Sequence, residues 1–98
     1  MRDLSSLTST DFDAVVGSDF QVGDDGTAPV GIRLREVLVG PEQPGRRRPF
    51  SLRFSGPAAP VLDSVSHRLH HAELGELEIF IVPIAAEPEG LVYEAVFT

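Results

Sequence analysis

Residues 77–97 read LEIFIVPIAAEPEGLVYEAVF, two apolar runs on either side of a loop rich in proline, glutamate and glycine. Both runs, 77–82 and 91–97, are rich in the β-branched and aromatic residues typical of strands. Glu94 stands between Tyr93 and Ala95, as expected for a strand with one exposed face. Apolar residues at every position of 79–82 predict a central strand covered on both faces. We expect Pro83 to end that strand, because proline lacks the donor for a ladder hydrogen bond.

Upstream of this pair, the sequence alternates with a period of two over four more segments, 19–22, 30–39, 50–55 and 64–69. The alternation is clearest where Phe50, Leu52 and Phe54 are separated by polar residues. In 30–39 the apolar positions change parity beyond Glu36. Because a one-residue shift turns every following side chain to the other face, we expect a β-bulge near Glu36.

One short helix is expected before the strands, over about residues 9–16. Thr8 is placed as its N-cap, and Asp11 follows three residues later in a capping-box arrangement. Leu7 and Phe12 have the spacing of a hydrophobic staple. Phe12, Val15 and Val16 would share one face, and Gly17 would stop the helix.

These elements predict an all-β fold, a single domain over residues 1–98. Its expected form is a small antiparallel six-stranded barrel or sandwich with the short N-terminal helix plugging one end. No helical pattern of about 10–15 residues separates the strands, which argues against βαβ units and a parallel sheet.

Composition limits the functions to consider. The 98 residues contain no cysteine, which excludes disulfides, thiolate zinc sites and cysteine nucleophiles. A formal charge of −7 disfavours binding to nucleic acid. The segment MRDLSS lacks the apolar core of a secretory signal, and no apolar run approaches the ~20 residues that span a bilayer. We therefore expect a cytoplasmic protein with no membrane or nucleic-acid partner.

Motifs for catalysis are weak. His67, His70, His71 and Glu73 are the only cluster of ligand type, but a strand turns His67 and His71 to one face and His70 to the other. We expect His67 to fill the rim of the core and His71 to cap the connection to Gly75. Serines beside these histidines lack a nucleophile-elbow motif, and no phosphate loop or dinucleotide fingerprint is present. The sequence thus predicts no catalytic residue, no metal ligand and no cofactor.

Charged loops are the more specific feature. The triplet at positions 46–48 is basic in an otherwise acidic chain, whereas two other loops carry paired acids. The basic loop is either a solvated tip that discourages aggregation or a finger that docks on an acidic surface, for example that of a neighbouring copy. The candidate partner-binding residues are Arg46, Arg47, Arg48, Asp24, Asp25, Glu87 and Glu89.

A set of motifs resembles a small bacterial domain-of-unknown-function family of about 100 residues. The matching segments are PFSLRFSGP at 49–57, LxHxxLGxL at 69–77, FxVP at 80–83 and YEAVF at 93–97. The resemblance extends over essentially the whole chain and brings no catalytic residues. Members of that family accompany phage-tail-collar-like proteins, which implies a structural or assembly role. The family more often has tyrosine at position 67, which favours a packing role for His67.

Three functions follow in order of preference. The first is a non-enzymatic structural, assembly or protein-interaction module, in a homo-oligomer or with another protein, as in a phage-tail-like or other multi-subunit bacterial structure. The second is a small-ligand-binding barrel whose mouth is lined by His67, Phe80 and Tyr93. The third is a metal-dependent enzyme.

Overall fold

Alternate side chains of six strands meet in one enclosed interior. The computed structural model describes residues 7–23, 29–42, 44–45 and 48–97. In that part of the chain, a helix precedes all the strands. The elements are α1 (Ser9–Asp13), β1 (Asp19–Val22), β2 (Val30–Val39), β3 (Phe50–Gly56), β4 (Val65–His71), β5 (Gly75–Glu87) and β6 (Gly90–Phe97).

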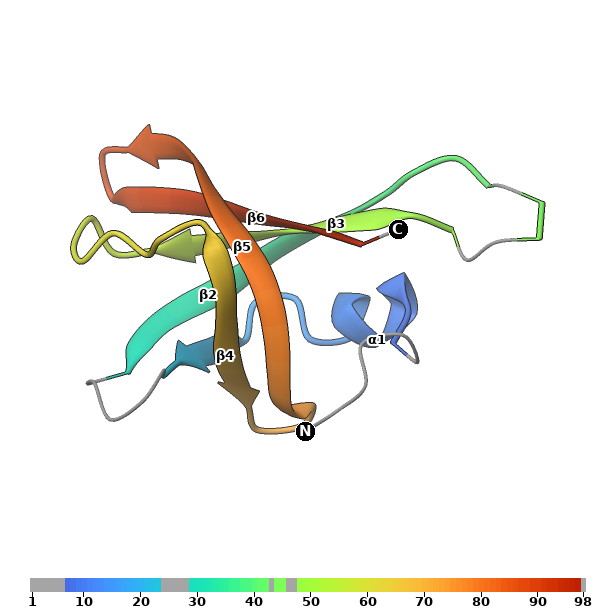
Figure 1. Cartoon of the computed structure of the whole chain (residues 1–98), viewed down its shortest axis with the longest axis horizontal. Helices are drawn as coiled ribbons and strands as arrows, with labels where there is room; N and C mark the ends of the chain where they lie inside the picture. The colour runs from blue at the N-terminus through green and yellow to red at the C-terminus, as the bar shows by residue number, and fades with distance from the viewer. Residues whose placement is uncertain (1–6, 24–28, 43, 46–47, 98) are drawn as a thin grey trace.

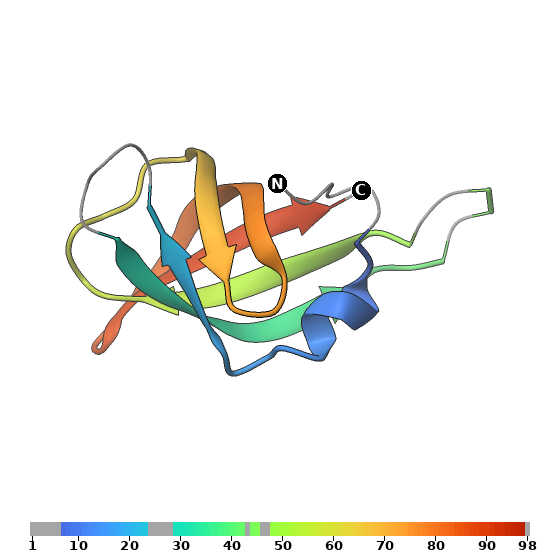
Figure 2. The ribbon, with the colours of Figure 1, turned by 90° about the horizontal axis from the view of Figure 1, so that it is seen from below.

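The strands close into a barrel in the order β1-β2-β3-β6-β5-β4, with every neighbouring pair antiparallel. Figure 1 shows β2, β3 and β6 running along the molecule, while β5 crosses over to pair with β4. In Figure 2, β4 and β1 lie side by side where the ring closes, through the pairs Gln21–His70 and Val22–Leu69. The expected all-β fold is confirmed, and of the two forms considered it is the barrel.

The helix is shorter than the expected 9–16. Its start matches the sequence pattern, because the Thr8 N–H donates to the Asp11 carboxylate at 2.8 Å. From Val15 on, the local hydrogen bonds span three residues, and the Gly17 N–H donates to the Leu34 carbonyl of β2 at 2.8 Å. Pairing with β2 therefore unwinds the last turn, and Val16 is exposed and not on the buried face.

Two bulges bend the barrel. The register of β2 against β3 shifts between Leu34 and Glu36, which confirms the expected bulge. A second shift, between Pro83 and Ala85, lies in β5. The prediction that Pro83 ends its strand is therefore wrong. Proline is compatible with a strand at a bulge, where the ladder is already interrupted, and β5 continues to Glu87.

Other strand bounds differ from the sequence pattern by a few residues. β3 extends to Gly56, and β4 is displaced to Val65–His71. β5 begins at Gly75, because the chain reverses tightly after β4 and backbone pairing continues to His71–Gly75. β6 begins at Gly90, which pairs with Glu87 across a two-residue turn. Backbone pairing, which does not depend on apolar side chains, sets these ends.

The expectation that 79–82 is covered on both faces is also wrong. Ile79 and Ile81 are buried, but Phe80 between them is 54% exposed. β5 belongs to a barrel with a single interior, and in the described chain nothing covers the outside of β5 at this point.

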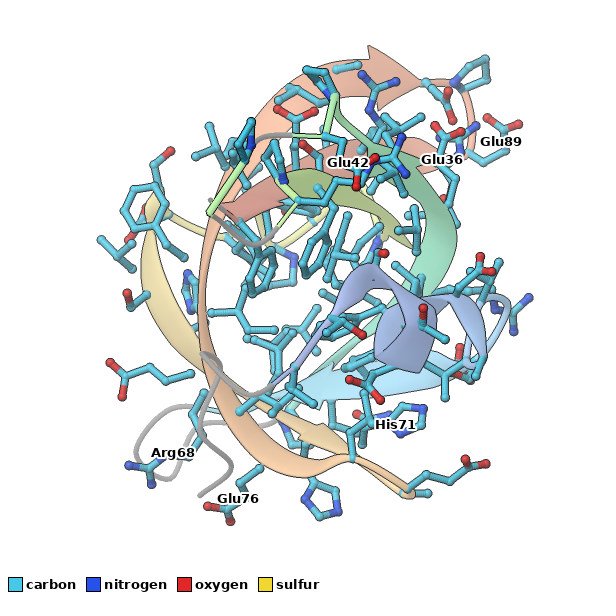
Figure 3. The ribbon with its side chains drawn as sticks, turned by 90° about the vertical axis from the view of Figure 1, so that its right-hand side faces the viewer. Glu36, Glu42, Arg68, His71, Glu76 and Glu89 are labelled. Carbon is cyan, nitrogen blue, oxygen red and sulfur yellow. The ribbon has the colours of Figure 1, made fainter. Side chains whose placement is uncertain are left out.

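Aromatic rings fill the barrel. Phe20 and Phe54 meet edge to face at 5.4 Å between ring centroids. At the helix end, Phe12 contacts Phe50 and Phe97, which stack on each other at 4.7 Å. The staple partners Leu7 and Phe12 are both buried. Figure 3 shows α1 lying across this end of the ring of strands, so the helix plugs the barrel as expected.

The turn between β5 and β6 depends on a close backbone approach at Gly90. A Cβ atom on Gly90 would lie 2.1 Å from the Gly56 carbonyl oxygen, and the residue has a φ of +154°. We predict that Gly90→Ala lowers the free energy of unfolding by at least about 2 kcal/mol, since both the clash and the backbone strain must be relieved. Urea denaturation measures this change.

Gly31→Ala is the matched control, because its Cβ would meet only the Gln21 side chain at an ordinary 3.6 Å. We expect a change within about 0.5 kcal/mol for the control. Equal effects of the two substitutions on the free energy of unfolding would show that the close approach of Gly90 to Gly56 does not determine the stability of this turn.

Candidate functional site

A hydrogen-bonded polar cluster joins Ser18, which precedes β1, to His71 at the end of β4. The backbone N–H groups of Glu73 and Leu74 donate to His71 Nδ1 at 3.0 and 3.2 Å. Because Nδ1 accepts, the neutral ring carries its proton on Nε2. Nε2 lies 2.8 Å from Ser18 Oγ, and the Ser18 hydroxyl donates to the Val15 carbonyl.

This geometry is the reverse of a catalytic serine–histidine pair. A general base must accept the serine proton on one ring nitrogen and donate from the other to an acid. In this protein Nε2–H donates to Ser18, and Nδ1 accepts from the backbone. His71 is also buried, and its ring contacts Phe20 at 4.5 Å between ring centroids. The role of this histidine is therefore structural. The expected role of His71, capping the connection to Gly75, is confirmed; the sequence alone did not reveal its partner Ser18.

The three histidines do not converge. His67 and His71 are buried in the barrel, whereas His70 is exposed on its outer face, as the alternation of β4 predicts. His67 Nε2 lies 2.9 Å from the Asp63 carbonyl. Within the described ranges, no group of three or more histidine, aspartate or glutamate side chains is placed to hold a metal ion.

The barrel mouth considered for a small ligand does not form. Tyr93 is fully buried, and its hydroxyl accepts a hydrogen bond from the Leu62 backbone N–H at 3.0 Å. His67 is also buried in the interior, but Phe80 is on the outside. These three side chains therefore do not line a common opening, because β5 turns Phe80 away from the other two.

The charged segments that the structure describes lie at opposite ends of the molecule. Arg46, Arg47, Asp24 and Asp25 are outside the described residues. Figure 1 shows the hairpin between β2 and β3, which carries Arg48, at one end of the long axis. The turn between β5 and β6, with Glu87 and Glu89, is at the other end.

Glu87 is engaged within its own chain. Its carboxylate accepts two hydrogen bonds from Arg35 Nη1, at 3.1 and 3.2 Å. This ion pair links β5 to β2 across the outside of β3 and β6. Tyr93 of β6 belongs to the core cluster, and Leu91 packs against that cluster. Alternation therefore turns Val92, which lies between them, outward, where it is buried in the hollow that it lines with Arg35 and Glu87. Glu87 is therefore paired within its own chain, and its contact with a partner stays a prediction.

An apolar groove is the feature that sequence reasoning missed. It has a volume of about 210 Å³ and lies on the outside of β2, β3 and β6, at the base of the hairpin. Leu38 and Val96 face each other across Ser51, since both pair with that residue. The remaining lining residues are Val39, Gly40, Pro49, Phe50 and Phe97. The sequence contained one indication of this groove. Every residue of 37–39 and of 95–97 is apolar, so alternation places apolar side chains on both faces of these strands.

The chain belongs to the family described as domain of unknown function (DUF6916), whose model matches residues 7–97. The expected membership of a small domain-of-unknown-function family is therefore confirmed. No curated protein and no solved structure matches the chain. In the described residues, no helix has the length and apolar character needed to cross a membrane.

The hydrogen bonds of His71 predict its contribution to stability. His71→Ala removes the acceptor for two backbone N–H groups and the contact with Phe20. We expect the free energy of unfolding to fall by about 2–4 kcal/mol. The neighbouring exposed His70→Ala is the control, with an expected change within about 0.5 kcal/mol. Chemical denaturation of both variants tests the assignment, and an undiminished stability of His71→Ala would contradict it.

Proposed function

We propose that this domain is a non-enzymatic protein-interaction module that assembles with other subunits through the apolar groove. The observation that supports the proposal is the gathering of exposed apolar side chains around that groove. Val96 is 65% exposed and Leu38 is 39% exposed, and the two share the outer face on either side of Ser51. Contiguous exposed apolar surface bordered by polar residues is typical of interaction sites.

The energetic argument is that these side chains gain free energy only when another molecule covers them. Complete burial of a valine or leucine side chain contributes about 1.5–3 kcal/mol. The core does not need Val96, since Phe97 and Ala95 on either side of it already face the interior. The apolar character of this outer face is therefore better explained by binding than by folding.

The alternatives have less support. A small ligand would need space in the barrel, but the interior positions are occupied by fully buried side chains such as Tyr93, Phe20 and Phe54. An enzyme would need an activated nucleophile or a general base, and the Ser18–His71 pair is oriented against both roles. The interaction module is the function for which the described residues provide a surface.

The setting that we propose is a multi-subunit bacterial assembly of the phage-tail-like kind, in the cytoplasm. This part of the proposal is supported by the sequence resemblance and by the acidic, cysteine-free composition.

Copurification from a lysate of the source cells tests the proposal with three forms of the tagged protein. Val96→Asp places a charge in the groove, and we expect it to lose a partner that the unchanged protein retains, because a buried carboxylate is costly without a counter-charge. Val16→Asp is the control, since Val16 is similarly exposed but does not line the groove. Retention of the same proteins by all three forms, each verified as folded by circular dichroism, would contradict the proposal.

A further inference from the structure

We propose that the partner is a second copy of this chain, bound head to tail. The end that carries the turn between β5 and β6 would dock in the apolar groove of the next copy, with Glu89 against Arg48. This inference rests on the interaction role proposed above and specifies the partner at the same groove.

The groove end presents a positive charge at its rim. Arg48 Nε donates to the Gly40 carbonyl at 2.7 Å, and Gly40 itself lines the groove. By contrast, Arg33, Arg35 and Arg53 are each paired with an acid of the same chain. Arg48 is exposed, and no carboxylate among the described residues pairs with it.

The opposite end presents the complementary features. Glu89 is exposed at the turn between β5 and β6 and forms no ion pair with any described residue. Beside it, Pro88, Ala85 and Ala86 are exposed, and the bulge residue Ile84 is 43% exposed. This end therefore offers a small apolar surface next to an unpaired negative charge.

These two surfaces cannot meet within one molecule, because they lie at opposite ends of its 41 Å long axis (Figure 1). They can meet between copies. A contact between two different surfaces is heterologous, and its repetition gives an open filament or, if the rotation closes, a ring.

Charge favours this arrangement over a two-fold dimer. Two grooves facing each other would bring Arg48 of both copies together, and like charges at an interface are unfavourable. Two copies of a chain with a net charge of −7 also repel one another in general. An Arg48–Glu89 contact at opposite ends orients the copies while keeping the remaining acidic surfaces apart.

A charge-exchange experiment on the full chain tests this arrangement. Sedimentation velocity over a range of concentrations measures self-association of the unchanged protein and of Arg48→Glu, Glu89→Arg and the double variant. Each single reversal places like charges in contact, and we expect about a fivefold weaker association. The double variant restores an opposite-charge contact and should associate as the unchanged protein does. An equimolar mixture of the single variants should also recover, because both mixed contacts pair opposite charges.

Two further variants complete the design. Val96→Asp should weaken association by at least about tenfold, since it charges the groove. Glu76→Arg makes the same charge change on the exposed outer face of β5, outside both the groove and the turn between β5 and β6, and should leave association unchanged.

Recovery in the double variant and in the mixture would support head-to-tail docking. Association that both single reversals leave unaffected, or that the mixture fails to recover, would overturn it. An unchanged protein that stays monomeric would also overturn it. If such a monomer still loses a copurified partner on Val96→Asp, the interaction role stands and only the self-docking inference fails. If Val96→Asp changes neither self-association nor copurification, both fail.

Discussion

The structure depends on one constraint, that alternate residues of all six strands must fill a single closed interior. A strand offers one set of alternate side chains to that interior, so each segment of the chain contributes at most half its residues to the core. The aromatic pairs of Phe20 with Phe54 and of Phe50 with Phe97 occupy the space that closure creates. Since the interior is filled, a binding function has to use the outer surface or the ends of the barrel.

The two bulges relate the closure of the barrel to the side chains on its outer surface. In β2 the extra residue is Arg35, and in β5 it is Ile84. Arg35 reaches Glu87 of β5 across β3 and β6, so the two irregular strands are linked over the sheet between them. Beyond the bulge, the shifted register places Leu38 opposite Ser51 on the outer face, where it lines the groove. The change in parity that shapes the barrel is thus also what turns Leu38 to its outside.

The polar groups of the interior serve the chain connections. His71 fixes the turn from β4 to β5 through two backbone N–H groups and reaches Ser18 at the entrance to β1. Tyr93 holds the segment before β4 through the Leu62 N–H. Each of these side chains ties a loop to the barrel where buried backbone groups would otherwise lack partners. This accounts for a histidine and a serine in contact without catalytic orientation.

The sequence by itself determined the strand class, the bulge near Glu36, the staple that starts the helix and the orientation of the three histidines. These features are local, because they depend on alternation and on short-range spacing along the chain. The tertiary structure alone decided that the sheet closes into a barrel, that α1 ends early by pairing with Leu34 and that β5 continues through Pro83. It also decided the contact of His71 with Ser18 and the groove between Leu38 and Val96. The reason is that each of these depends on pairing between segments distant in the sequence, and the pattern within one strand specifies which residues face inward but not which strand lies beside it.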